Sequence, residues 1–239
     1  MNTDSPHGPD RTQFFDRMVD GHDWDDRTNT FETNRRLRLI FDDLLGLVDL
    51  QGKSLLDGGS GGGHFSAAAC RRGANVTSLD VGQNLLDQVK KRCDSTRVIG
   101  SILDLPFPDG SFDVVISTEV IEHTPDPERG VRELCRMVKP GGVLVLTSPN
   151  RLWQPVVRLA TATRLRHYAG YENFLWAHRA RDVIRSAGLD VECFRGFNVL
   201  PLFKPVFEPL LAFADERLGE LVPDAFVNFA VRARRRNAS

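Results

Sequence analysis

The stretch LLDGGSGGGHFS, residues 55–66, is an apolar run that ends at Asp57 and passes into a segment dominated by glycine. Five of the six residues 58–63 are glycine. Glycine inside a helix or a strand costs about 0.5–1 kcal/mol relative to alanine, so this composition predicts a loop. A bare loop directly after a carboxylate could hold a dinucleotide, a phosphate or another small cofactor, or could be only a tight turn.

Strand-like and helix-like segments alternate around this loop. Apolar runs predict strands, and amphipathic segments predict the helices between them. We expect strands at 54–58, 75–81, 96–101, 112–118, 143–148, 189–197 and 225–235, and helices at 64–73, 83–93, 125–138 and 178–187, with KPGG at 139–142 ending the third helix. Such alternation predicts an α/β fold with a doubly wound, mostly parallel sheet and helices on both faces.

The flanking segments complete the expected domain organisation. Residues 1–50 are expected to form an N-terminal helical cap, because apolar residues recur at helical spacing in its second half. Residues 51–239 are expected to form the main domain, with an apolar insertion at 198–223 between the last two strands. This insertion is either a helix packed on the domain, or a lid or apolar surface for an apolar substrate or a membrane.

Composition narrows the class of protein. The 239 residues are 41% hydrophobic and 26% charged, as is usual for a soluble globular protein, and the net charge is −1. This balance does not favour nucleic acid as a partner. The basic cluster at residues 232–236 is expected to be a solvated chain end.

Cysteine usage and hydropathy indicate the compartment. The four cysteines lie far apart without a CxxC pair, which predicts free thiols and not a zinc site or a disulfide framework. The N-terminus has no apolar signal-peptide region, and no apolar run reaches the roughly 18 residues of a membrane span. We therefore expect a cytoplasmic protein without a transmembrane segment. Peripheral contact with a membrane and the oligomeric state stay open.

A second carboxylate, Asp80, sharpens the choice of ligand. It ends the next expected strand, which is the usual place of an acid that binds a ribose diol. NAD fits less well, because Asp57 would repel a pyrophosphate and His64 stands where G-x-G-x-x-G has its third glycine. The glycine loop itself contains no GKS or GKT sequence of the kind that holds a nucleoside triphosphate. S-adenosylmethionine, a nucleoside joined to a cationic amino acid, meets these constraints.

Three segments carry a resemblance to a known family: LLDGGSGGG, ANVTSLDVGQNLLDQVKKR, and the run from LPFPDGSFDVVISTEVIEH to KPGGVLVLTSPNR. Over residues 35–151 the chain resembles class I S-adenosylmethionine-dependent methyltransferases of type 11, and it is most similar to the ubiquinone-biosynthesis O-methyltransferase group. The resemblance implies a Rossmann-like sheet of seven mostly parallel strands with an antiparallel last strand. It also implies the cofactor S-adenosyl-L-methionine and the product S-adenosyl-L-homocysteine.

The resemblance further implies which residues bind the cofactor. The loop would face the methionine half of the cofactor, Asp80 the ribose hydroxyls, and Val81 the adenine. Ser101 and Ile102 stand where the family often has an Asp-Ala pair beside the adenine. The complete implied set is Asp57, Gly59, Gly61, Gly63, Asp80, Val81, Ser101, Ile102, Thr118 and Glu119, the last two at the amino acid end of the cofactor.

Histidine and aromatic residues are the candidates for contact with the methyl acceptor. Methyl transfer to a hydroxyl requires a base, and His123 in EVIEHTPDP is the leading candidate, ahead of His64. Trp153, Tyr168 and Tyr171 are expected to line a substrate pocket. The sequence HDWDD at 22–26 is interpreted as a solvated acidic turn, and no metal is expected.

The expected function is methyl transfer to a small-molecule acceptor, with a hydroxyl oxygen of an apolar or specialised metabolite as the first choice. One alternative is an N- or C-methyltransferase that acts on a natural product or an amino sugar. The others are a cofactor-binding protein without catalysis and an NAD-linked oxidoreductase, against which the charge of Asp57 argues.

Overall fold

The computed structural model describes residues 30–165, 171–198 and 217–237. The chain divides into two compact units, Met1–Ser101 and Ile102–Ser239. Several expectations fall outside the described residues: the first part of the N-terminal cap, the HDWDD turn, Tyr168 and most of the insertion at 198–223.

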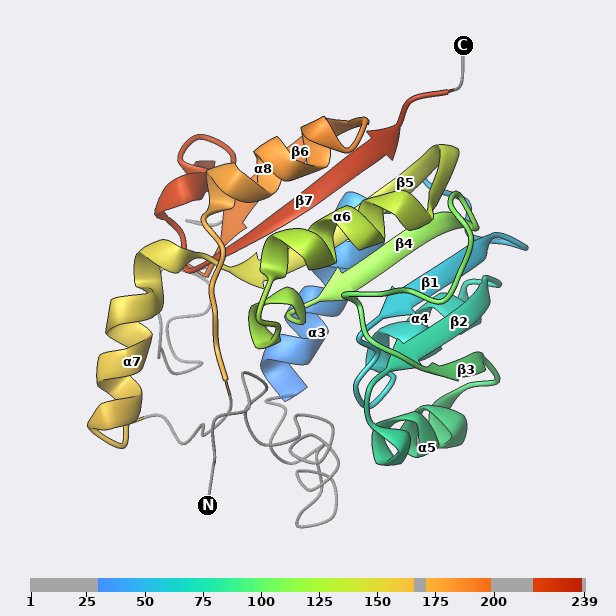
Figure 1. The fold of residues 1–239 in the computed structure, drawn as a ribbon, viewed down its shortest axis with the longest axis horizontal. Coiled ribbons are helices and arrows are strands. Elements are labelled where there is room, and N and C mark those ends of the chain that lie inside the picture. Colours follow the sequence, from blue (N-terminus) through green and yellow to red (C-terminus); the bar gives the residue numbers. More distant parts are fainter. Residues whose placement is uncertain (1–29, 166–170, 199–216, 238–239) are drawn as a thin grey trace, which may run out of the picture. The chain divides into compact units, whose positions relative to one another are not determined.

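Seven strands form a sheet in the order β3-β2-β1-β4-β5-β7-β6 (Figure 1). In the first unit, β1 pairs with β2 and β2 with β3, both in parallel. In the second unit, β4 and β5 are parallel, whereas β7 lies antiparallel between β5 and β6. The predicted seven-stranded, mostly parallel sheet with an antiparallel last strand is therefore confirmed.

The first unit consists of three strands and the helices between and before them. Its elements are α3 (Thr30–Arg38), the π-helical turn η1 (Leu39–Leu44), β1 (Ser54–Gly58), α4 (His64–Arg71), β2 (Asn75–Asp80), α5 (Gln83–Arg92) and β3 (Thr96–Ile99). Helix α4 packs on α3, β1 and β2, and α5 packs on β2 and β3. The apolar residues Leu55, Leu56 and Leu79 of the strands are fully buried. The predicted strands and the helices between them lie within two residues of the observed ones.

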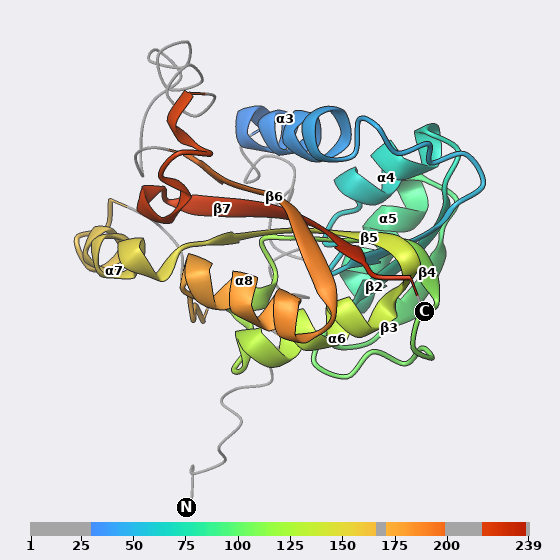
Figure 2. The same ribbon diagram turned by 90° about the horizontal axis from the view of Figure 1, so that it is seen from above.

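The second unit holds the remaining four strands. Its strands are β4 (Phe112–Thr118), β5 (Val138–Pro149), β6 (Leu189–Phe197) and β7 (Asn228–Arg235), and its helices are α6 (Pro127–Met137), α7 (Gln154–Ala162) and α8 (Ala177–Ser186). Short helical turns lie at η2 (Ile121–His123), η3 (Arg151–Trp153) and η5 (Pro223–Ala225). Helices α6 and α8 lie side by side on one face of these strands (Figure 2).

We had expected the KPGG sequence at residues 139–142 to separate α6 from the following strand. This expectation is wrong, because β5 already begins at Val138. Gly142 lets the strand pass close to its neighbour, since a Cβ atom there would lie 2.8 Å from the carbonyl oxygen of Asp113. Lys139 donates to the Asp113 carboxylate at 3.0 Å. The pairing shifts register between Phe112 and Val114, which accommodates the longer strand.

We had also expected the basic cluster at residues 232–236 to be a solvated chain end, and this expectation is wrong as well. Most of it belongs to β7, and two of its arginines, Arg234 and Arg236, pair with acidic residues of β6. Arg234 contacts Glu192 at 2.6 Å, and Arg236 contacts Asp190 at 2.7 Å. The positive charges are thus neutralised across neighbouring strands, a pairing that the local sequence does not reveal.

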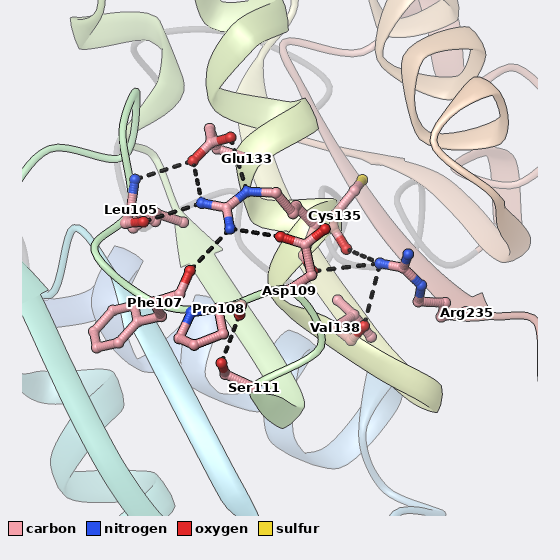
Figure 3. Close-up of polar contacts among 10 residues, drawn as sticks. Leu105, Phe107, Pro108, Asp109, Ser111, Glu133, Cys135, Val138 and Arg235 are labelled. Atoms are coloured by element: carbon pink, nitrogen blue, oxygen red, sulfur yellow. Dashed lines mark hydrogen bonds and ion pairs between the residues drawn. The ribbon is translucent and has the colours of Figure 1, made fainter.

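The side chain of Arg136, on α6, holds the segment that leads into β4 (Figure 3). Its guanidinium donates to the carbonyl oxygens of Leu105 and Phe107 at 3.0 and 2.8 Å and to the carboxylate of Asp109 at 2.8 Å. Glu133 accepts from Arg136 at 2.7 Å and from the Leu105 amide at 3.0 Å. The Arg136 contact lowers the pKa of Glu133, so this carboxylate stays charged.

A second arginine, Arg235 in β7, caps the carboxyl end of α6 (Figure 3). Its Nη1 donates to the carbonyl oxygens of Cys135 at 3.1 Å and of Arg136 and Val138 at 3.3 Å. A cation at this end of a helix satisfies carbonyl groups that have no partner within the helix and complements the helix dipole. The last strand therefore fixes the end of a helix that lies about 100 residues earlier in the chain.

The four cysteines are free thiols. Burial raises the pKa of Cys135 to about 12, so this thiol stays protonated and unreactive. Among residues 30–165, 171–198 and 217–237, no helix has the length and apolar character that a membrane crossing requires.

Candidate functional site

The glycine loop connects the end of β1 to the start of α4. Gly59, Gly61 and Gly63 have φ angles of 82°, 50° and 86°, in the left-handed region that favours glycine. A Cβ atom at Gly63 would lie 2.9 Å from the Cα atom of Val89, so glycine is also required there by space. At Gly61, by contrast, a Cβ atom would meet nothing within 4 Å. The loop therefore packs tightly on α5 at Gly63 and leaves open space at Gly61.

Asp80, at the end of β2, ties the strand to this loop. Its Oδ2 accepts from the Gly61 amide at 2.8 Å, and its Oδ1 accepts from the Gly82 amide at 3.2 Å. Each carboxylate oxygen can accept more than one hydrogen bond, so both oxygens retain acceptor capacity. A rigidly held pair of acceptors at this position suits the two hydroxyls of a ribose.

Asp57 lies at the other side of the loop, in β1, and is only 1% exposed. Burial and, to a smaller extent, the like charge of Asp80 raise the pKa of its carboxyl group to about 7, against the lowering effect of a hydrogen bond from Ser66. The Ser66 hydroxyl donates to Oδ2 of Asp57 at 2.6 Å. A buried carboxyl group of this kind ionises readily only beside a positive charge, which favours a cationic ligand and disfavours a phosphate.

Ser60, inside the glycine loop, adds an unsatisfied hydroxyl. The residue is only 5% exposed, and its Oγ has no hydrogen-bond partner among the described residues. A buried polar atom without a partner is unusual in folded proteins and indicates a ligand or a water molecule. The open space at Gly61, the two carboxylates and the Ser60 hydroxyl therefore fit a nucleoside that carries an ammonium group.

The segment after β3 contains the residues predicted for the adenine. The Gly100 amide donates to the carbonyl oxygen of Asp80 at 3.0 Å, which holds the start of this segment beside the end of β2. Val81 and Ser101 are half-buried. Ile102 is buried in the second unit, where its Cδ1 would lie 3.3 Å from a Cβ atom at Gly130. Their contacts with adenine stay predictions.

In the second unit, Glu119 directly follows β4 in a strained backbone conformation. Its φ angle is 55°, which is uncommon for a residue other than glycine and is often found at functional sites. Its amide donates to the carbonyl oxygen of Thr147 at 3.1 Å, and its Oε2 accepts from Asn228 at 2.7 Å. These bonds hold the carboxylate in one orientation. Beside it, the buried hydroxyls of Thr118 and Thr147 have no hydrogen-bond partner among the described residues.

His123 ends the turn η2, and its ring is held by one defined hydrogen bond. Nδ1 lies 3.1 Å from the carbonyl oxygen of Tyr171, which can only accept, so Nδ1 carries the proton in this contact. In the neutral ring Nε2 has the lone pair, and this atom lies 4.0 Å from Oε1 of the buried Glu122. Glu122 in turn accepts from the Ser148 hydroxyl at 3.3 Å. In its neutral form this imidazole can take up a proton at Nε2.

The aromatic residues predicted for the substrate have different surroundings. Tyr171 is exposed, and its contact with His123 uses the backbone and not the phenol ring. Trp153 donates from Nε1 to the carbonyl oxygen of Ala225 at 2.9 Å, which anchors the start of α7. The Asn173 amide donates to the carbonyl oxygen of Glu122 at 2.7 Å. Residues 171–173 thus pack on the His123 turn, whereas a contact of Trp153 or Tyr171 with substrate stays a prediction.

Sequence reasoning missed three serines of the first unit: Ser60, Ser66 and Ser78. Ser60 stands in the glycine loop, where a polar residue among glycines was a usable signal. Ser66 and Ser78 lie inside a helix and a strand, where small residues usually indicate close packing. Within the described residues, no group of three or more His, Cys, Asp or Glu side chains is arranged to hold a metal ion.

Comparisons with known proteins agree with this geometry. A family model described as a methyltransferase domain matches residues 56–146. The chain is 36% identical to the ubiquinone biosynthesis O-methyltransferase of Pseudomonas aeruginosa over 141 residues, which are 54% of this chain and 59% of that relative. It is 29% identical to the enzyme of the same name from Pseudomonas fluorescens over 233 residues, 90% of this chain and 92% of that relative.

The fold has a matching solved structure as well. Magnesium protoporphyrin IX methyltransferase from Synechocystis PCC 6803, solved with bound SAH, superimposes with a TM-score of 0.66 at 13% identity, covering 94% of this chain and 98% of that one. At this identity the likeness concerns the fold alone. Together, the sequence matches support a class I S-adenosylmethionine-dependent methyltransferase that is similar to the ubiquinone biosynthesis O-methyltransferases, and the solved structure shows the same fold.

Proposed function

We propose that this protein transfers the methyl group of S-adenosylmethionine to a hydroxyl oxygen of a small apolar or specialised metabolite and releases S-adenosylhomocysteine. The observation that carries the proposal is the pair of buried carboxylates, Asp57 and Asp80, on either side of the glycine loop. One accommodates a positive charge and the other offers two fixed acceptor oxygens. A nucleoside attached to an amino acid requires both.

The residues of the first unit have distinct roles in this proposal. Asp80 accepts hydrogen bonds from the ribose hydroxyls with the lone pairs that Gly61 and Gly82 do not use. Asp57 faces the ammonium group of the cofactor, and Ser60 supplies a hydroxyl that has no partner in the described protein. The cofactor, when bound, supplies an electrophilic methyl group on a sulfonium sulfur.

His123 acts on the acceptor as a general base. Nε2 takes the hydroxyl proton, while the Nδ1 contact with the Tyr171 carbonyl oxygen keeps the ring in one orientation and one tautomer. The buried Glu122 lies 4.0 Å from Nε2 and stabilises the imidazolium that forms. The protein otherwise contributes by holding the acceptor oxygen in line with the methyl group.

An exposed apolar face supports an apolar acceptor. Leu152, Val156, Leu159 and Leu165 lie on or beside α7, and all four are exposed. Residues 151–165 contain three arginines and no acidic residue, and those arginines are exposed. Apolar and cationic side chains together suit an amphipathic acceptor, or one presented at a lipid surface.

The test of the cofactor is calorimetric titration with S-adenosylhomocysteine, with NAD in a parallel cell. Micromolar binding of S-adenosylhomocysteine alone supports the proposal, whereas binding of NAD alone overturns it. Catalysis is tested with S-adenosylmethionine that carries a deuterated methyl group, incubated with apolar and polar fractions of a metabolite extract.

A product heavier by one labelled methyl group in the apolar fraction supports the acceptor class, and fragmentation of that product locates the methyl on oxygen, nitrogen or carbon. Methylation on nitrogen or carbon would favour the alternative of a natural-product or amino-sugar methyltransferase. His123→Gln, which retains a polar side chain but not the base, should reduce labelling of a hydroxyl acceptor and leave S-adenosylhomocysteine binding in place.

A further inference from the structure

A chain of buried hydroxyl groups leads away from Asp57 into the first unit. Ser66 in α4 donates to Oδ2 of Asp57 at 2.6 Å. Its Oγ lies 2.7 Å from the Oγ of Ser78 in β2, which lies 2.8 Å from the Oγ of Ser95. All three serines are buried, so these hydroxyls have one another as partners in place of solvent.

The direction of these hydrogen bonds can follow the charge of Asp57. When the carboxylate is ionised, Ser66 donates to it, Ser78 donates to Ser66, and Ser95 donates to Ser78, which uses one proton for each bond. When the carboxyl group is protonated, it donates to Ser66 and all three hydroxyls turn the other way. Hydroxyl groups can make both arrangements because each is a donor and an acceptor. The chain therefore satisfies the site in either protonation state.

The charges around Asp57 favour the protonated state as long as no cation is present. The group is buried, and Asp80, at the end of β2, faces it with a like charge. These two effects raise the pKa to about 7, so close to half of the molecules hold the proton at neutral pH. An ammonium group beside Asp57 would reverse this balance, because an opposite charge favours the ionised carboxylate.

We infer that Ser66 is a positioning residue that holds the Asp57 carboxyl group and, by reversing its hydrogen bond, lets this group lose its proton as the cationic cofactor binds. The inference rests on the proposed function. Binding then releases one proton from Asp57 to the solvent, and the three hydroxyls turn toward the new carboxylate. Cofactor affinity consequently depends on pH through Asp57, and Ser66, which does not itself touch the cofactor, sets the midpoint of that dependence.

The expected signature is a rise of affinity with pH. A ligand that binds only the ionised form should bind about tenfold more weakly for each pH unit below the midpoint near 7, and should reach a constant affinity above it. Calorimetric titrations with S-adenosylhomocysteine between pH 5.5 and 8.5 measure this profile. Repeating them in buffers with different ionisation enthalpies counts the protons released, which should approach one at pH 6.

Variants of the serines test whether Ser66 controls the pH at which Asp57 loses its proton. Ser66→Ala removes the hydrogen bond that favours the carboxylate, so the midpoint should move to higher pH and the affinity at pH 7 should fall several-fold. Ser66→Thr keeps the hydroxyl and should restore the original midpoint. Ser78→Ala breaks the chain one step further on and should move the midpoint in the same direction by less. Ser186→Ala, on α8, is the matched control for loss of a helical serine.

Two further variants separate Asp57 from other titrating groups. Asp57→Asn should bind without releasing a proton at any pH, and its titration also subtracts proton exchange by the ligand itself. His64→Asn, at the first residue of α4, should still release the proton, because this histidine is not its source.

The outcomes distinguish failure of the inference from failure of the proposed function. Absence of S-adenosylhomocysteine binding at every pH would overturn the proposed function. Tight binding with no pH dependence and no proton release would overturn the inference and leave the function standing. An unchanged midpoint in Ser66→Ala or Ser78→Ala would remove the serines from control of Asp57. If neither alanine variant folds, loss of the midpoint in a folded Ser66→Thr overturns the inference, and its retention supports it.

Discussion

The carboxylate of Asp80 accepts a 2.8 Å hydrogen bond from the backbone amide of Gly61, so the side chain that ends β2 also fixes the glycine loop after β1. A loop this rich in glycine would otherwise lose much conformational entropy when it closes on a ligand. The bond orders the loop before the ligand arrives. In the proposed function, Asp80 therefore contributes to affinity twice, by preorganising the loop and by accepting hydrogen bonds from the ligand.

Replacing Asp80 tests this double role. Asp80→Ala should weaken S-adenosylhomocysteine binding about 10- to 100-fold or more, because hydrogen bonds to a charged group contribute about 1.5–3 kcal/mol. Asp80→Asn keeps one acceptor oxygen and should lose less. Calorimetric titration measures both affinities, and an unchanged affinity in Asp80→Ala would remove this residue from the site.

Gly63 should be the loop residue least tolerant of a side chain. Gly63→Ala combines a positive φ of 86° with a contact of 2.9 Å to the backbone of Val89, so we expect a loss of about 1–3 kcal/mol in the free energy of unfolding. Gly61→Ala is the matched variant, with a positive φ but open space, and should lose about 1 kcal/mol. Urea unfolding of both proteins measures the difference, and equal losses would contradict the steric argument.

The raised pKa of Asp57 predicts how stability without cofactor depends on pH. The folded protein binds the proton more tightly than the unfolded chain, whose carboxyl group has its ordinary pKa of 3.8. The contribution of Asp57 to the free energy of unfolding is therefore greatest below pH 3.8. It declines as pH rises to about 7, by up to roughly 4 kcal/mol.

Asp57→Asn removes this decline because an amide does not ionise in this range. The variant should gain stability relative to the natural protein between pH 5 and pH 8, while its affinity for S-adenosylhomocysteine falls. Urea unfolding of both proteins at pH 5 and at pH 8, without ligand, measures this gain. The contributions of other titrating groups cancel in the difference between the two proteins. A constant stability difference between the two proteins would show that Asp57 does not titrate there.

His123 should affect turnover far more than cofactor binding. With a hydroxyl acceptor, His123→Ala should lower kcat about 10²- to 10⁴-fold, the usual contribution of a general base. His178→Ala, an exposed histidine on α8, is the control and should retain full turnover. Steady-state kinetics on the acceptor found in the labelling experiment provide the measurement. Full activity of His123→Ala at all pH values would end its role as the base.

Arg136 should be a major determinant of stability in the second unit. Arg136→Ala leaves two backbone carbonyl groups and two carboxylates without their donor, so we expect a loss of about 2–3 kcal/mol. Arg132→Ala, one turn earlier on the exposed side of α6, breaks only a surface pair with Glu128 and should lose at most about 0.5 kcal/mol. Thermal or urea unfolding compares the two variants.

Local sequence patterns were sufficient for most of the fold. Strands β1 and β4 were predicted with their observed ends, because apolar runs were bounded by clear turn signals. The glycine loop and Asp80 could be assigned in the same way. The KPGG segment could not, since Gly142 serves a close approach to Asp113 that only the paired strand defines.

The contacts that could not be predicted are those between residues distant in the sequence. Ser66 reaches Asp57 only because α4 packs on β1, and His123 is held by a backbone oxygen 48 residues away. Neither contact leaves a local pattern. The basic cluster at 232–236 was misinterpreted for the same reason, because its acidic partners lie in β6.

The position of β7 has a consequence for synthesis of the protein in the cell. This strand is the last in the sequence, yet it lies between β5 and β6 and pairs with both. A nascent chain on the ribosome therefore carries β5 and β6 without their common neighbour until the residues of β7 have emerged. Exposed strand edges of this kind promote aggregation. The second half of the sheet is thus completed only after β7 has been synthesised, and until then β6 and one edge of β5 lack their partner strand.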